Sequence, residues 1–295
     1  MKQKITPHLW FDAQAKEAAE FYVSIFPGSK VKNIATLHDT PSGDVDVVSF
    51  DLVGQPFMAI SAGPYFKFNP SVSFLVICKT KEEVDALWAK LSKGAILMEL
   101  GEYPFSKRYG WTEDNYGLSW QIMLADEHHY FKHTITPTLL FVGDVCGKAE
   151  EAMNFYASVF PDSKAGDMAR YPAGMDPEKE GTVMHGAVDL AGQEFFAMDS
   201  AREHKFAFNE AISFMVNCED QKEIDYYWEK LSAVPEAEQC GWIKDKYGLS
   251  WQIVPAAMSE IMGTKDEEKR ARVTRAFLKM KKFDIAELMR AAEGK

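Results

Sequence analysis

The sequence predicts an α+β fold made of two tandem domains followed by a helical C-terminal tail. Three observations support this prediction. The segment Tyr116–Ile122 recurs letter for letter as Tyr247–Ile253, which marks an internal duplication. Strand-like and helix-like patterns follow one another in the same order within both copies. The 295 residues are also enough for two domains of ordinary size.

The first copy begins with a strand over residues 5–11. Its two faces are Ile5, Pro7, Leu9 and Phe11 on one side and Thr6, His8, Trp10 and Asp12 on the other. Residues 15–25 place apolar side chains at helical spacing, and Pro27 and Gly28 end that helix. Three strand-like segments follow at about 31–38, 45–53 and 56–61. Together they predict one β-α-β-β-β module.

A second module of the same kind follows in the first copy. Residues 72–78 read as a strand and residues 80–92 as a helix. Thr80 and Glu83 form a capping-box pattern at the start of that helix. Segments near 95–100, 103–109 and 117–124 then alternate as strands do. The first 125 residues therefore predict two modules in series.

The second copy repeats this order. Ile135–Phe141 matches Ile5–Phe11 at an offset of 130 residues, and the offset grows to 140 before it falls to 131 at the final motif. Insertions and deletions fall where loops are expected. We therefore expect a domain over 1–126, a linker over 127–133, a second domain over 134–256 and a charged helical tail over 257–295. The apolar stripe of the tail is short, so we expect it to dock on its own body or on a second subunit.

Composition and charge narrow the function classes. The net charge is −11, which argues against a nucleic-acid partner, because phosphate binding needs clustered cations. No apolar run approaches the ~18 residues that span a membrane, and the first residues lack the apolar segment of a signal peptide. The four cysteines show no C-x-x-C spacing. We therefore expect reduced thiols and a cytoplasmic protein.

The repeated motifs resemble the PhnB-like family. The most specific is the frame Gly-Trp-x-x-Asp-x-Tyr-Gly-Leu-Ser-Trp-Gln-Ile, which starts at Gly110 and again at Gly241. The family often carries the description 3-demethylubiquinone-9 3-methyltransferase. It is a branch of the vicinal oxygen chelate superfamily, with glyoxalase I, bleomycin-resistance proteins and extradiol dioxygenases. The resemblance covers roughly residues 4–125 and 134–255.

The resemblance implies two glyoxalase-like domains, each a pair of β-α-β-β-β modules with curved mixed sheets around a concave cavity. It also implies that the two domains pair as a pseudo-dimer within one chain, with a homodimer of the whole chain left open. The methyltransferase description is read here as a name and not as an activity. Methyltransferases bind their nucleotide-like cofactor at a glycine-rich turn after the first strand, and no G-x-G pattern occurs in this sequence. No cofactor is expected.

In metal-dependent members of the superfamily, His and Glu ligands come from the first and last strands of the modules. The resemblance places those positions at His8, Ser73 and Gln121 in the first copy and at Thr138, Ser213 and Gln252 in the second. His8 alone is a good metal ligand in this set. One imidazole and one amide are too few ligands to hold a divalent ion tightly, so no metal is expected.

If this mapping holds, strand alternation points His8, Trp10, Ser73 and Gln121 into one cavity in the first domain. Such a mixed polar and aromatic pocket is typical of a small-molecule site. The second copy offers a more apolar set, formed by Leu140, Ser213, Met215 and Gln252. The alternative interpretation is that Gln121 and Gln252 only tie sheet strands together. We expect Trp120 and Trp251 in the core, and Asp114 and Asp245 as turn formers.

Two hypotheses about function remain. The first is a protein that binds a small molecule through His8, Trp10, Ser73, Gln121, Ser213 and Gln252, with no metal. The second is a metal-assisted glyoxalase- or dioxygenase-like enzyme that uses His8 as a ligand. The linker histidines His128, His129 and His133 could also bind a metal, although a solvated linker is the simpler interpretation.

Overall fold

The computed structural model describes residues 3–125, 132–262, 264 and 266–295. The chain divides into two compact units. Unit 1 comprises residues 1–67 together with 209–295, and unit 2 comprises residues 68–208. Each unit therefore combines one module from each sequence repeat. The two sequence repeats, residues 1–126 and 134–256, are the copies of the duplication. They are not the compact units, because each unit contains one module from each repeat.

Unit 1 is built on a seven-stranded sheet with the strand order β14-β15-β13-β1-β4-β3-β2. Its first module contains β1 (Ile5–Phe11), α1 (Ala15–Ile25), β2 (Lys30–Thr40), β3 (Gly43–Leu52) and β4 (Gln55–Ser61). Its second module contains β13 (Ile212–Cys218), α4 (Gln221–Leu231), the 3-10 turn Pro235–Ala237, β14 (Trp242–Lys244) and β15 (Ser250–Pro255). The modules join through the antiparallel pair β1 and β13.

Unit 2 is built on an eight-stranded sheet with the order β10-β11-β12-β9-β5-β8-β7-β6. One module contains β5 (Val72–Cys78), α2 (Lys81–Leu91), β6 (Ile96–Tyr103), β7 (Ser106–Glu113) and β8 (Ser119–Leu124). The other contains β9 (Ile135–Phe141), the 3-10 turn Gly143–Val145, α3 (Ala149–Val159), β10 (Lys164–Arg170), β11 (Val183–Leu190) and β12 (Gln193–Asp199). Here the modules join through β5 and β9. The strand and helix order expected from the sequence is confirmed.

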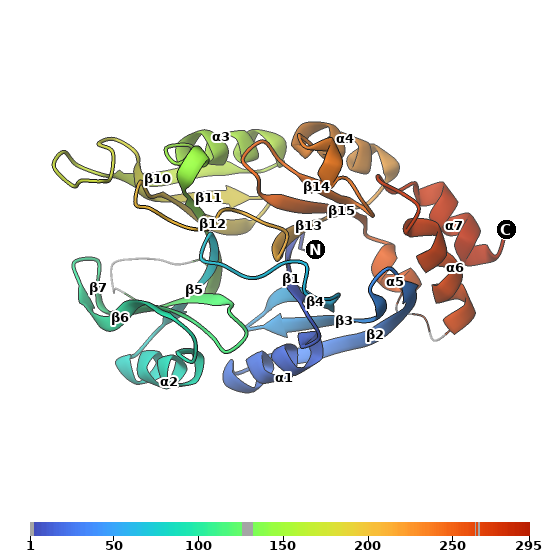
Figure 1. Cartoon of the computed structure of the whole chain (residues 1–295), viewed down its shortest axis with the longest axis horizontal. Coiled ribbons are helices and arrows are strands. Elements are labelled where there is room, and N and C mark those ends of the chain that lie inside the picture. Colours follow the sequence, from blue (N-terminus) through green and yellow to red (C-terminus); the bar gives the residue numbers. More distant parts are fainter. Residues whose placement is uncertain (1–2, 126–131, 263, 265) are drawn as a thin grey trace. The chain divides into compact units, whose positions relative to one another are not determined.

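Each curved sheet carries the helices of its two modules on one face, α1 and α4 in unit 1 and α2 and α3 in unit 2 (Figure 1). In unit 1 the alternation of β1 sends Ile5, Leu9 and Phe11 into the core on the face where α1 and α4 pack. The opposite face of the same strand carries Thr6, His8 and Trp10. We call this second side the inner face. It is the side on which the candidate site lies.

The aspartate, the turn glycine and the second tryptophan of the repeated motif each have a structural role. The buried Asp114 carboxylate accepts N–H bonds from Tyr116 and Leu118 and, at 2.9 Å, the indole N–H of Trp120. Gly117 takes the positive φ of 83° that the turn requires. Asp245 makes the same three bonds in the second copy, and Trp120 and Trp251 are fully buried. The expected turn and core roles are confirmed.

The C-terminal tail docks on unit 1. It consists of α5 (Met258–Met262), α6 (Glu267–Phe277) and α7 (Ile285–Glu293), and α6 packs against β2. Cys240 and Gly241, just before β14, donate their backbone N–H groups to the carbonyls of Met280 and Lys281. Since β2 and β14 are the two edge strands of the sheet, the tail connects both edges. Docking on the body, one of the two expected arrangements, is confirmed.

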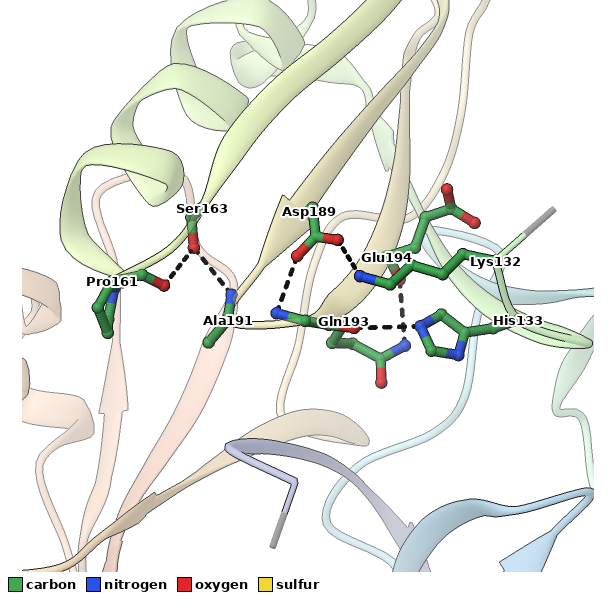
Figure 2. A network of polar contacts seen from close by, with 9 residues as sticks. Lys132, His133, Pro161, Ser163, Asp189, Ala191, Gln193 and Glu194 are labelled. Atoms are coloured by element: carbon green, nitrogen blue, oxygen red, sulfur yellow. Dashed lines mark hydrogen bonds and ion pairs between the residues drawn. The ribbon is translucent and has the colours of Figure 1, made fainter. Parts of the chain in front are cut away.

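The last residues of the linker are tied to the turn between β11 and β12 (Figure 2). Lys132 pairs with Asp189, whose carboxylate also accepts the N–H of Gly192 at 2.8 Å. The carbonyl of Gly192 accepts a bond of 3.1 Å from His133 Nε2, so that nitrogen carries the proton. Two of the linker histidines lie outside the described residues: His128 and His129. No helix in the described part of the chain is long and apolar enough to cross a membrane.

Candidate functional site

The site begins with the pairing of β1 and β13 in unit 1. This antiparallel register places His8 directly opposite Ser213. Residues opposite each other on neighbouring strands point to the same face of a sheet. His8, Trp10 and Ser213 therefore share the inner face, although they come from different sequence repeats.

The final strand adds two polar side chains to this face. β15 runs parallel to β13, with Ser250 aligned to Ser213 and Gln252 aligned to Met215. Gln252 Nε2 donates to Ser213 Oγ at 2.9 Å. Ser250 lies two residues before Gln252 and so on the same face. The strand thus adds a hydroxyl and an amide to the inner face that also carries His8.

Aromatic rings border these polar groups. The ring of Trp242, on β14, meets His8 edge to face at 5.5 Å between centroids and Trp10 at 5.9 Å. Trp10 also meets Phe66 at 5.1 Å and Tyr65 at 6.4 Å. These are favourable T-shaped contacts. They hold Trp10 and Trp242 as two walls that meet at an interplanar angle of 75°.

His8 is a neutral group in this setting. Its side chain is 5% exposed, and burial lowers its pKa from 6.5 to about 3, because a charged imidazole is costly in a low-dielectric site. Its buried Nδ1 atom has no hydrogen-bond partner among the described residues, and neither does the buried Ser250 Oγ. Such groups are uncommon in folded proteins and cost about 1–3 kcal/mol each.

The equivalent strands of unit 2 form a more self-contained arrangement. Gln121 Nε2 donates to Ser73 Oγ at 2.8 Å, while Gln121 Oε1 accepts the hydroxyl of Tyr109 at 2.7 Å. Burial raises the pKa of Tyr109, so its phenol stays a donor. Thr138 stands opposite Ser73, and its buried hydroxyl has no partner in the part of the chain that the structure describes. Gln121 thus acts mainly as a tie between β7, β8 and β5.

The two copies of the Gly-Trp frame also differ. In unit 2, Trp111 Nε1 donates to Ser119 Oγ at 2.7 Å. In unit 1, Trp242 instead packs on His8 and Trp10. This leaves the hydroxyl of Ser250, the counterpart of Ser119, without a partner among the described residues. The same sequence motif therefore has a hydrogen-bonded serine hydroxyl in unit 2 and, among the described residues, an unpaired serine hydroxyl in unit 1.

The structure divides the grouping expected from the sequence between two sheets. His8 and Trp10 belong to unit 1, whereas Ser73 and Gln121 belong to unit 2. Within unit 1, the polar residues on the inner face with His8 are Ser213 and Gln252. The expected group of His8, Trp10, Ser73 and Gln121 therefore does not share one sheet, because β1 pairs with β13 and not with β5.

The second expected group is divided between the two sheets in the same way. Leu140 lies on β9 in unit 2, whereas Ser213, Met215 and Gln252 lie in unit 1. Sequence reasoning also missed Trp242 and Ser250. Both belong to the repeated frame. The sequence did contain a signal, because Trp10 in the first copy corresponds to Leu140 in the second. Trp242 therefore has an aromatic neighbour at a position where Trp111 has leucine.

A divalent metal does not fit the donors of this inner face. His8 supplies an imidazole, Ser213 a hydroxyl and Gln252 a neutral amide, and the residue aligned with His8 on β4 is Met58. A tightly bound divalent metal in a protein needs several imidazole, thiolate or carboxylate ligands. No group of three His, Cys, Asp or Glu side chains placed to hold a metal occurs within residues 3–125, 132–262, 264 and 266–295.

Comparison with known proteins identifies the family. A family model described as 3-demethylubiquinone-9 3-methyltransferase matches residues 3–123 and again 133–254. A PhnB protein from Bacillus cereus is 43% identical over 42% of this chain and all of its own, with a TM-score of 0.39. A protein from Staphylococcus aureus is 33% identical over 42% of this chain and 97% of its own, with a TM-score of 0.18.

A glyoxalase I variant from Zea mays shares the fold over most of the chain. It is 11% identical, with a TM-score of 0.52, over 86% of this chain and 94% of its own. No curated protein matches. Because the family model matches both repeats, the chain belongs to the family described as 3-demethylubiquinone-9 3-methyltransferase.

Proposed function

We propose that this protein binds a small organic molecule on the inner face of unit 1, without a metal ion. The observation that carries the proposal is the pair of buried, unpartnered atoms His8 Nδ1 and Ser250 Oγ beside the aromatic walls Trp10 and Trp242. A ligand that hydrogen-bonds to both atoms would offset the cost of burying them. Aromatic walls with a few convergent polar groups are typical of small-molecule sites.

The comparison between the two units supports this assignment. A residue with only a structural role would be expected to make the same hydrogen bonds in both copies. Gln121 bonds two side chains in unit 2, whereas among the described residues the Gln252 side chain bonds only Ser213, through its amide nitrogen. The spare amide oxygen of Gln252 adds an acceptor to the proposed site. We therefore assign His8, Trp10, Ser213 and Gln252 to ligand binding in unit 1, and we give Ser73 and Gln121 a structural role.

A metal-assisted reaction of the glyoxalase or dioxygenase type is the second candidate. It is favoured by the fold shared with the Zea mays glyoxalase I variant. The donor set around His8 argues against it, because a hydroxyl, an amide and a thioether are weak ligands for a divalent ion. Methyl transfer is not proposed, because Asp12 and the residues after β1 include no glycine-rich turn for a nucleotide cofactor.

The remaining expectations concern the surroundings of the protein. All four cysteines are free, which agrees with reduced thiols in a cytoplasmic protein. The acidic net charge of −11 disfavours nucleic acid as a partner. We propose that module exchange makes the two repeats an intertwined pseudo-dimer. A measurement of the molecular mass in solution would show whether two copies of the whole chain also form a homodimer.

A metal assay separates the two candidate functions. The purified full-length protein and the variant His8→Ala would be analysed for bound metal and titrated with Zn²⁺ and Ni²⁺ by calorimetry. The expected result is no stoichiometric metal, with equally weak titrations for both proteins. A tightly bound stoichiometric ion that is lost in His8→Ala would overturn the proposal in favour of the metal-assisted enzyme.

A further inference from the structure

We propose that the inner face of unit 1 selects an uncharged, planar ligand that carries both hydrogen-bond donors and acceptors, and that Ser250 and Trp242 contribute to this selection. This inference rests on the proposed function and deepens it. It assigns a ligand class and two residues that the family resemblance does not provide.

The polar side chains of the site carry no charge. His8, Ser213, Ser250 and Gln252 are all neutral groups, and each is less than a tenth exposed. Among the described residues aligned with them, Lys244 carries a charge. Its ammonium group is already paired with a carboxylate of unit 1 at 2.8 Å. A charged ligand would lose its hydration on this face and find no free countercharge among these aligned residues, which is strongly unfavourable.

The unpaired atoms define what the ligand must offer. Ser250 Oγ can donate one hydrogen bond and accept others, and Gln252 Oε1 accepts. His8 Nδ1 accepts or donates according to the tautomer of the neutral ring. A ligand with acceptors alone would leave Gln252 Oε1 unpaired, and a ligand with donors alone would leave the Ser250 hydroxyl proton without an acceptor. An amide or a heteroaromatic ring with adjacent donor and acceptor atoms would satisfy them.

The aromatic geometry favours a flat molecule. Trp10 donates its indole N–H to the carbonyl of Gly63 at 2.8 Å, which fixes its ring. Trp242 meets it at 75°, so the two rings form a corner that can present one ring face and one ring edge. A planar group can stack on the face while its rim touches the edge. Aromatic walls alone would also suit a cation, and the absence of a free carboxylate from the aligned residues decides against that alternative.

Unit 2 provides an internal control for this interpretation. Ser119 occupies the position of Ser250, but its hydroxyl is occupied by Trp111. The corresponding hydroxyl in unit 1 became available because Trp242 packs on Trp10 and His8 instead. Ser250 and Ser119 are therefore a matched pair, in which the same substitution removes a free hydroxyl in one unit and an engaged hydroxyl in the other.

The test uses three probes of the same shape and different charge. Benzamide is neutral, benzoate is an anion and benzamidine is a cation. Each would be titrated at millimolar concentration into the ¹⁵N-labelled full-length protein, with the indole N–H signals of Trp10 and Trp242 as the readout. Benzamide should shift both signals, and the two charged probes should bind at least about tenfold more weakly. Ser250→Ala should weaken benzamide binding about threefold to tenfold, and Ser119→Ala should leave it unchanged.

The outcomes separate this inference from the proposed function. If benzoate or benzamidine shifts the Trp10 and Trp242 signals at equal or lower concentration than benzamide, the site exists and the ligand class is wrong. If Ser250→Ala binds benzamide as the unaltered protein does, Ser250 has no role in recognition. If none of the three probes moves either signal, both the ligand class and the proposed site are contradicted.

Discussion

His8 of the first sequence repeat lies directly opposite Ser213 of the second, on the antiparallel strands β1 and β13. This contact shows that the polar cluster of unit 1 requires both repeats. Gln252, also from the second repeat, bonds to Ser213 and extends the cluster across a third strand. The duplication therefore forms the proposed site only when modules of different repeats pair with each other.

The first prediction concerns how the chain can be divided. Asn209 Nδ2 donates to the carbonyl of Lys67 at 2.8 Å, so the two segments of unit 1 meet where unit 2 leaves the chain. A protein with residues 1–67 joined to 209–295 by a short flexible linker should fold as a monomer with a cooperative unfolding transition, and so should residues 68–208 alone. Light scattering and urea unfolding provide the measurement.

The sequence repeat provides the control for this experiment. Residues 1–126 contain β1 and β5 without their antiparallel partners β13 and β9. The isolated repeat should therefore be unfolded or should pair with a second copy of itself. A monomeric, cooperatively folded 1–126 would contradict the assignment of the compact units.

The second prediction concerns the tail. Phe283 is 5% exposed and packs so closely on Gly241 that a Cβ atom at that glycine would lie 2.5 Å from its ring. Phe283→Ala should lower the free energy of unfolding by about 3–5 kcal/mol, because it leaves a cavity under the tail. The control Lys282→Ala removes only an exposed pair with Asp225 and should change stability by less than about 1 kcal/mol. Equal effects in urea unfolding would show that the tail is not anchored by Phe283.

The third prediction concerns the repeated motif. Asp245 accepts two backbone N–H bonds and the indole N–H of Trp251. Asp245→Ala would leave these donors unpaired and should cost about 3 kcal/mol or more. The equivalent change Asp114→Ala should be similarly costly in unit 2. Calorimetric unfolding of both variants is the check, and a loss below about 1 kcal/mol in either would contradict the role assigned to the motif.

The fourth prediction concerns pH. The pKa of His8 is about 3 in the folded protein and about 6.5 in the unfolded chain. Above pH ~6.5 both states are neutral at this residue, so it has no effect on stability. Below that value the unfolded state binds a proton that the folded state does not, and stability falls by up to about 1.4 kcal/mol per pH unit down to about pH 3.

The variant His8→Asn isolates this contribution. Between about pH 6.5 and pH 5.5, the unaltered protein should lose about 1 kcal/mol more stability than His8→Asn does. Urea unfolding at the two pH values gives both slopes, and the other histidines contribute equally to each protein. Identical slopes would mean that the imidazole of His8 is not buried in its neutral form.

Strand periodicity predicts most of the fold, because each module buries one face of its strands against a helix. The alternation of residues 5–11 and the apolar spacing of residues 15–25 match β1 and α1 residue for residue. The hairpin of β6 and β7 is less well predicted. It begins at Ile96 and turns at residues 104 and 105, a few residues later than the pattern suggests, because register shifts interrupt its pairing.

The exchange of modules could not be predicted from the sequence. Ser73 and Ser213 hold equivalent positions in nearly equivalent strands, so either strand offers β1 the same pattern of side chains. The choice between β5 and β13 depends on packing of the whole chain. His8, Trp10, Ser213 and Gln252 all belong to unit 1, and their grouping depended on that choice.

The most direct test of the proposed site is a crystal structure of the full-length protein soaked with benzamide. The account predicts density for the probe against the rings of Trp10 and Trp242, with hydrogen bonds to Ser250 Oγ and to His8 or Gln252. Density for the probe only in unit 2, or a divalent metal ion bound by His8 in its place, would contradict it.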